Sequence, residues 1–184
     1  MIEEKYKTFW PRFLAAIVDS LVFMPLGIAD YFIRENYNII NDAVIYFWFI
    51  LASLAFMIYS VLMHGIYGQT LGKMAMNVKV LDISENKLSM LQALKRDIIP
   101  IILTCICIAI VLIERINYTG TNALSFTYNI ASYLIEYVGF AWFIAEIVTM
   151  LFNDKRRAIH DFIAGSVVIK EIQQNQYSRS LRSG

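Results

Sequence analysis

The residues best suited to chemistry in this chain are charged side chains placed inside or beside long apolar segments. Arg12 and Asp19 are seven residues apart, and Asp30 follows eleven residues later, so a helix would carry all three on one face, with Asp19 about 10 Å from Arg12 along the axis. Charged groups within a span face a bundle interior, a partner or a water path. This stripe predicts a proton or cation site, although Arg12 can instead anchor at lipid phosphates and Asp30 can reach the far interface.

Two further apolar segments carry polar side chains at helical spacings. Ser53, Ser60 and His64 are separated by seven and four residues and would share a face, either as a proton path or as interhelical hydrogen bonds. Glu136 and Glu146 differ by about 80° around a helix. Each glutamate suits either proton exchange in an ion-coupled carrier or a buried structural hydrogen bond.

A short apolar stretch, residues 158–165, follows the basic residues 155–157 and has Asp161 at its middle. It is too short to span a membrane, so we expect a short helix or turn at the interface. Asp161 can then reach Arg12, and Asp19 can compete for the same guanidinium, which offers five donors. One cation against two anions would leave one negative charge for a proton or metal cation to neutralise.

The composition indicates the environment in which these residues lie. The chain is 58% hydrophobic and 17% charged, whereas soluble domains are about 45–50% apolar and about 25% charged. Four segments approach the roughly 20 apolar residues that a span requires: residues 13–33, 43–64, about 97–113 and about 126–152. Ser89 and Gln92 form a capping-box pattern, so the third helix is expected to begin near Met90 and to bend near Pro100.

The distribution of positive charge predicts the orientation. Fourteen of the sixteen Lys and Arg residues lie in the N-terminal segment, in the middle loop 65–97 and after the fourth span, and the other two connections hold one each, Arg34 and Arg115. Cytoplasmic loops retain positive charge. Both termini and the middle loop are therefore expected in the cytoplasm, with the protein in the inner or plasma membrane.

Two segments outside the spans have the pattern of strands. Residues 77–82 alternate polar and apolar side chains, and residues 166–170 are rich in β-branched residues, so they are expected to pair with each other. The predicted fold is an all-α membrane protein: a four-transmembrane-helix bundle with a small cytoplasmic β-ribbon and a short interfacial helix. Residues 1–172 would form one membrane domain, and residues 173–184 a flexible cytoplasmic tail.

Three ordered motifs resemble a known family. They are Trp10-Pro11-Arg12-Phe13-Leu14-Ala15-Ala16-Ile17-Val18-Asp19, then Gly68-Gln69-Thr70-Leu71-Gly72-Lys73 with Val78-Lys79-Val80-Leu81-Asp82, then Arg157-Ala158-Ile159-His160-Asp161-Phe162-Ile163-Ala164-Gly165-Ser166. Together they resemble the RDD family of membrane proteins, named for one arginine and two aspartates. The resemblance implies that Arg12, Asp19 and Asp161 are these three residues; Ser166 stands where the family commonly has Thr.

The resemblance implies two kinds of function. One is a small carrier that exchanges a monovalent cation for a proton. From the charged residues we expect that Asp19 would bind the cation or proton, Arg12 and Asp161 would set its pKa or gate the cytoplasmic entrance, and Glu136 or Glu146 would continue the path. A homo-oligomer would then enclose that path. The alternative is a non-transporting scaffold or accessory factor of a membrane complex, favoured by the lack of broken helices and of an inverted repeat.

Other functions find little support in the sequence. The neighbours His160 and Asp161 have no matching nucleophile or metal-ligand motif, so we expect no enzyme, no metal and no cofactor. Cys105 and Cys107 would leave a helix in nearly opposite directions. The glycine-rich segment 68–73 does not match a phosphate-binding loop, because its glycine spacing is one residue short and no Ser or Thr follows Lys73. Lys73 is instead expected at lipid phosphates. The expected partner is the lipid bilayer, and nothing indicates nucleic acid.

Overall fold

The computed structural model describes residues 4–36, 39–117 and 121–171, and most of these are helical. The long helices are α1 (Phe9–Glu35), α2 (Asp42–Tyr67), α5 (Ile98–Asn117) and α6 (Thr121–Leu151). The short elements are η1 (Glu4–Tyr6), α3 (Leu71–Ala75), β1 (Val78–Asp82), α4 (Met90–Arg96), α7 (Ile159–Ala164) and β2 (Ser166–Lys170). The predicted tail, residues 173–184, lies outside the described residues.

Large apolar side chains are exposed along the long helices, among them Leu21 on α1 and Phe47 on α2, as expected for surfaces that face lipid. Within the described part of the chain, α1 and α2 are long and apolar enough to cross a membrane, and α4 with α5 adds a third if the pair is one broken span. The fourth expected span falls on α6, whose first side chains are not among those described. The structure therefore supports two or three membrane-spanning helices.

The chain divides into two compact units. One contains Met1–Val22, Tyr59–Asp97 and Ile144–Gly184 and includes both strands; it is named the ribbon unit here. The other contains Phe23–Ile58 and Ile98–Phe143 and is named the helical unit. In the helical unit Ile45, Phe49, Cys107 and Val111 form the buried core.

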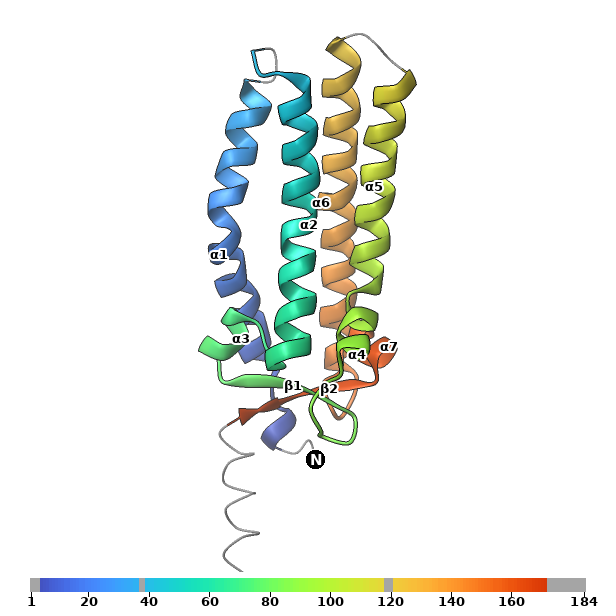
Figure 1. Ribbon diagram of the computed structural model, residues 1–184. Coiled ribbons are helices and arrows are strands. Elements are labelled where there is room, and N and C mark those ends of the chain that lie inside the picture. The colour runs from blue at the N-terminus through green and yellow to red at the C-terminus, as the bar shows by residue number, and fades with distance from the viewer. Residues whose placement is uncertain (1–3, 37–38, 118–120, 172–184) are drawn as a thin grey trace, which may run out of the picture. The chain divides into compact units, whose positions relative to one another are not determined.

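The strands of the ribbon unit confirm the predicted β-ribbon. β1 and β2 pair antiparallel, with Val80 opposite Val168 and Asp82 opposite Ser166. The pairing gives hydrogen-bond partners to backbone groups of two segments that lie far apart in the sequence. In Figure 1 the two strands lie side by side, with η1, α3, α4 and α7 around them.

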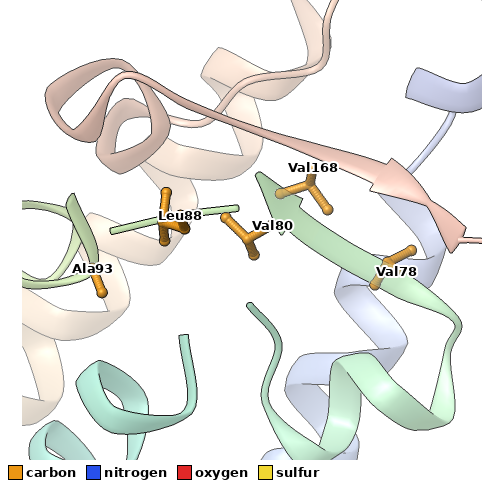
Figure 2. Close-up of a cluster of buried hydrophobic side chains, with 5 residues drawn as sticks. All are labelled: Val78, Val80, Leu88, Ala93 and Val168. Atoms are coloured by element: carbon orange, nitrogen blue, oxygen red, sulfur yellow. The ribbon is translucent and has the colours of Figure 1, made fainter. Parts of the chain in front are cut away.

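Both faces of the ribbon are covered by apolar side chains. Val78, Val80 and Val168 pack with Leu88 and Ala93, as Figure 2 shows. The opposite face buries Tyr6, Leu81, Val167 and Ile169. Because successive strand residues point to opposite faces, the uninterrupted apolar run of β2 is what allows it to be covered on both sides.

The start of α4 also agrees with the sequence prediction. The Ser89 hydroxyl accepts from the Gln92 backbone N–H, and the Gln92 side chain accepts from the Ser89 N–H, so the expected capping box is present and the helix begins at Met90. The helix breaks at Asp97, three residues before Pro100. Proline cannot donate to the carbonyl four residues earlier, that of Arg96, which accounts for a break at this point.

Candidate functional site

Asp161 is positioned by the geometry of both ends of α7. It is the third residue of the helix, and its Oδ2 accepts a hydrogen bond from the Ala158 backbone N–H at 2.9 Å. Gly165 ends the helix with φ of 62°, a left-handed conformation that glycine adopts at little cost. The turn at Gly165 brings Ser166 back beneath the helix, where its hydroxyl donates to Asp161 Oδ1 at 3.2 Å.

Two arginines from distant parts of the chain pair with this carboxylate. Arg12 Nη1 lies 2.8 Å from Asp161 Oδ2, and Arg96 Nη1 lies 2.8 Å from Oδ1. Asp161 is 0% exposed, Arg96 2% and Arg12 8%. The contact expected between Arg12 and Asp161 is therefore present, and it is joined by Arg96, which the sequence analysis had counted only toward orientation.

The electrostatics of Asp161 follow from these partners. Burial alone would raise its pKa, but the Arg12 and Arg96 guanidiniums and the Ala158 N–H favour the charged form and hold the pKa well below the usual value of an aspartate. The group is thus an ionised carboxylate, and both of its oxygens accept from an arginine and from a second donor.

His160 completes the cluster and is held in one tautomer. Arg96 Nη2 lies 2.6 Å from His160 Nε2 and Arg12 Nη2 lies 3.2 Å from it. A guanidinium can only donate, so Nε2 must accept, and the ring proton lies on Nδ1, which donates to Glu146 Oε1. Burial and the Arg96 charge lower the pKa of His160, in agreement with a neutral ring.

We name Arg12, Arg96, Glu146, His160 and Asp161 the Arg–Asp cluster. With His160 neutral, two cations face two anions, so the charges balance. The expected excess of one negative charge is therefore wrong, because Arg96 supplies a second cation. No group of three or more His, Cys, Asp or Glu side chains among the described residues is arranged to hold a metal ion.

Asp19 lies outside this cluster and has a different role. Its Oδ1 accepts from the Tyr59 hydroxyl and the Gly72 N–H, both at 2.8 Å, and its Oδ2 accepts from the Thr70 hydroxyl at 2.6 Å. The expectation that Asp19 competes for Arg12 is wrong, since Asp19 lies two helical turns away and is satisfied by the N-terminus of α3. Thr70 also caps that helix by accepting from the Lys73 N–H at 3.3 Å.

Gly72 allows the close approach between α3 and α1. A Cβ at this position would overlap the Ala15 carbonyl oxygen and lie 2.9 Å from the Asp19 carboxyl carbon. The motif Gly68-Gln69-Thr70-Leu71-Gly72-Lys73 therefore forms a helix start whose backbone and hydroxyl donors bind a carboxylate of α1. The anion bound at the start of α3 is therefore the Asp19 side chain.

The polar face of α2 forms a second buried set of contacts. Ser60 donates to Asp97 Oδ2 at 2.8 Å and lies 3.3 Å from His64 Nδ1, and Lys73 Nζ lies 2.5 Å from His64 Nε2. Lys73, expected at lipid phosphates, is instead mostly enclosed. Ser53, which was expected on the same stripe, belongs to the helical unit.

The remaining predicted residues do not join the Arg–Asp cluster. Asp30 accepts a hydrogen bond from the Trp48 indole at 3.2 Å within the helical unit. Glu136 is exposed on α6. Glu146, on the same helix, contacts His160 as described above, so the two glutamates expected on one broad face have different surroundings.

The sequence analysis missed four residues that complete these contacts: Tyr59, Thr70, Arg96 and Asp97. One signal could have found Arg96, because the capping box fixes the start of α4 and places Arg96 on the same face as Ala93, three residues before it. Both residues are buried. For Thr70 no such signal exists, since its partner lies 51 residues away in the sequence.

Comparison with known proteins identifies the family of this chain. A family model described as the RDD family matches residues 6–165. No curated protein and no solved structure matched the chain. The matched region includes the N-terminal arginine, the α3 motif and α7, and it covers most of the sequence; the chain therefore belongs to the RDD family and is a membrane protein with apolar helices.

Proposed function

We propose that this protein is a non-catalytic, non-transporting membrane scaffold, in which the Arg–Asp cluster joins α1, α4 and α7 into one rigid unit beside the membrane. The observation that carries the proposal is the saturation of Asp161. Each of its oxygens accepts from an arginine at 2.8 Å and from a second donor, which leaves no coordination position for a cation.

Asp19 supports the same function. Its three donors come from Tyr59, Thr70 and Gly72, so this carboxylate connects α1 to α2 and α3. We infer that this buried carboxylate specifies which segments come together, at the cost of desolvating its charge. In the proposed topology four helices cross the membrane, and both termini, the middle loop and the two strands lie in the cytoplasm. There the strands and the short helices around them would hold a partner membrane complex.

A carrier that exchanges a monovalent cation for a proton is the second candidate. Its support is the presence of the carboxyl groups of Asp30 and Glu136 within long helices that are largely apolar, since charged groups within spans usually mark a path. A homo-oligomer would then be needed to enclose that path.

Flux measurements distinguish the two candidates. Proteoliposomes containing the wild type, Asp19→Asn or Glu136→Gln would be loaded with a pH-sensitive dye and challenged with Na⁺, K⁺ or Li⁺. The scaffold proposal predicts that all three match empty vesicles. Cation-dependent proton flux in the wild type that is lost in either variant would overturn it.

Gentle solubilisation with chemical cross-linking provides the positive test. The proposal predicts that one membrane complex is recovered with the wild type in fixed stoichiometry and is lost with Asp161→Asn. A protein recovered only with itself would count against the scaffold.

A further inference from the structure

Four polar side chains of the ribbon unit form a hydrogen-bonded chain that includes no member of the Arg–Asp cluster. It consists of Lys73 on α3, His64 and Ser60 on α2, and Asp97 at the break after α4. The contacts are 2.5 Å from Lys73 Nζ to His64 Nε2, 3.3 Å between His64 Nδ1 and Ser60 Oγ, and 2.8 Å from Ser60 Oγ to Asp97 Oδ2.

The donors in this chain all point the same way. Lys73 can donate and His64 Nε2 must accept, so the neutral ring carries its proton on Nδ1 and donates it to Ser60. The Ser60 hydroxyl then donates to Asp97. The middle of the chain is buried, with His64 3% and Ser60 6% exposed, whereas Lys73 and Asp97 at its ends are each partly exposed.

We propose that Lys73, His64, Ser60 and Asp97 form a proton relay that interconverts an ionised Lys73–Asp97 pair and a neutral one. Lys73 transfers a proton to His64 Nε2, His64 transfers its Nδ1 proton to Ser60 Oγ, and Ser60 transfers its hydroxyl proton to Asp97 Oδ2. The products are a neutral amine, the other His64 tautomer, an intact serine hydroxyl and a protonated carboxyl. Every hydrogen bond reverses direction, and no proton is gained or lost.

The surroundings of Lys73 weaken its preference for the ionised form. Burial and the nearby Arg96 and Arg12 charges lower the pKa of Lys73 well below its ordinary value, while Asp161 and Asp97 oppose that shift. His64 faces Lys73, Arg96 and His160, so an imidazolium is disfavoured beside two cations and a concerted transfer avoids it. The relay therefore moves charge between α3 and the end of α4 through a buried path.

This inference does not depend on the scaffold proposal. The relay connects two groups of the same unit, so it moves charge within that unit whether or not any ion crosses the membrane. In the neutral state Lys73 would no longer repel Arg12 and Arg96, which connects the state of the relay to the Arg–Asp cluster.

Two spectroscopic signals test the relay in full-length protein in lipid nanodiscs. Infrared spectroscopy would follow the carbonyl band of protonated Asp97, assigned with Asp97→Asn, and ¹⁵N NMR would follow the His64 tautomer, both over a temperature series at fixed pH. Because the transfer is internal, the relay predicts that the fraction of protonated Asp97 equals the fraction of His64 protonated on Nε2 at every temperature. Unequal fractions in the wild type would overturn the proposal.

Ser60→Ala removes the link in the middle, and Ser53→Ala is the matched control on the same helix. We expect Ser60→Ala to make the two fractions unequal and Ser53→Ala to leave them equal. Lys73→Met provides a second check, because without the proton source the His64 tautomer change should be lost. Equal fractions that persist in Ser60→Ala, or an unchanged tautomer change in Lys73→Met, would contradict the relay.

Discussion

Replacement of Asp161 by asparagine tests the Arg–Asp cluster most sharply. The substitution keeps the size of the side chain but removes the charge that Arg12 and Arg96 each contact at 2.8 Å in a fully buried position. Breaking a buried ion pair by removing one partner costs about 3–5 kcal/mol, because the remaining charge is left uncompensated. Here two guanidiniums are left, so we expect a loss toward the upper end of that range.

The assay is reversible unfolding in mixed micelles, with the free energy of unfolding compared with that of the wild type. Glu85→Gln is the matched control, since the Lys5–Glu85 pair is about one-third exposed, at 32% and 35%, and such pairs contribute about 0–1 kcal/mol. The double variant Asp161→Asn/Arg96→Gln should lose less than the sum of the single variants, because it removes one stranded charge.

The same variant has a defined pH dependence. The folded-state pKa of Asp161 is depressed, so the stability it contributes is present above the unfolded-state pKa of about 3.9 and is lost as the pH falls below that value toward the folded-state pKa. Asp161→Asn should lack this acid-dependent loss. A cost of Asp161→Asn no larger than that of Glu85→Gln, or an unchanged acid profile, would refute the cluster as described.

Three further predictions follow from the packing of the ribbon unit. Gly72→Ala should cost about 1–3 kcal/mol of unfolding free energy through steric overlap. Gly139→Ala is the control, because the space around Gly139 is open, and it should stabilise α6 by about 0.5–1 kcal/mol. Equal effects of the two substitutions in chemical denaturation would contradict the tight contact at Gly72. Because burial lowers the pKa of His160, its contribution to stability should be complete above pH about 6.5 and fall below it, and His160→Gln should flatten that part of the stability profile. A cysteine pair at Val80 and Val168, which face each other, should cross-link on oxidation, and failure at this register would disprove the ribbon.

Much of the ribbon unit could be predicted because its signals are local or periodic. The alternation in residues 77–82 and the β-branched run 166–170 each predict a strand, and two lone strands must pair to satisfy their backbones. The capping box predicted the start of α4 from two side chains. The contact between Arg12 and Asp161 was predicted because both residues were expected at the cytoplasmic boundary.

The partners of Asp19 and Lys73 could not be predicted for identifiable physical reasons. Asp19 is bound partly by the Gly72 backbone N–H, and backbone donors leave no trace in residue type. Lys73 was assigned to lipid because positive residues near a span commonly reach phosphates, and only the fold brings it to His64. Arg96 was counted with other basic residues, so the charge balance around Asp161 came out wrong.

The most direct test of the central claim, that no cation position is open at Asp161, is thermal unfolding in the presence of different cations at equal ionic strength. A ligand that binds the folded state raises its stability in proportion to the logarithm of its concentration. The account predicts the same midpoint in Na⁺, K⁺, Li⁺ and N-methylglucamine. A stabilisation that grows with one alkali cation and disappears in Asp161→Asn or Asp19→Asn would contradict it.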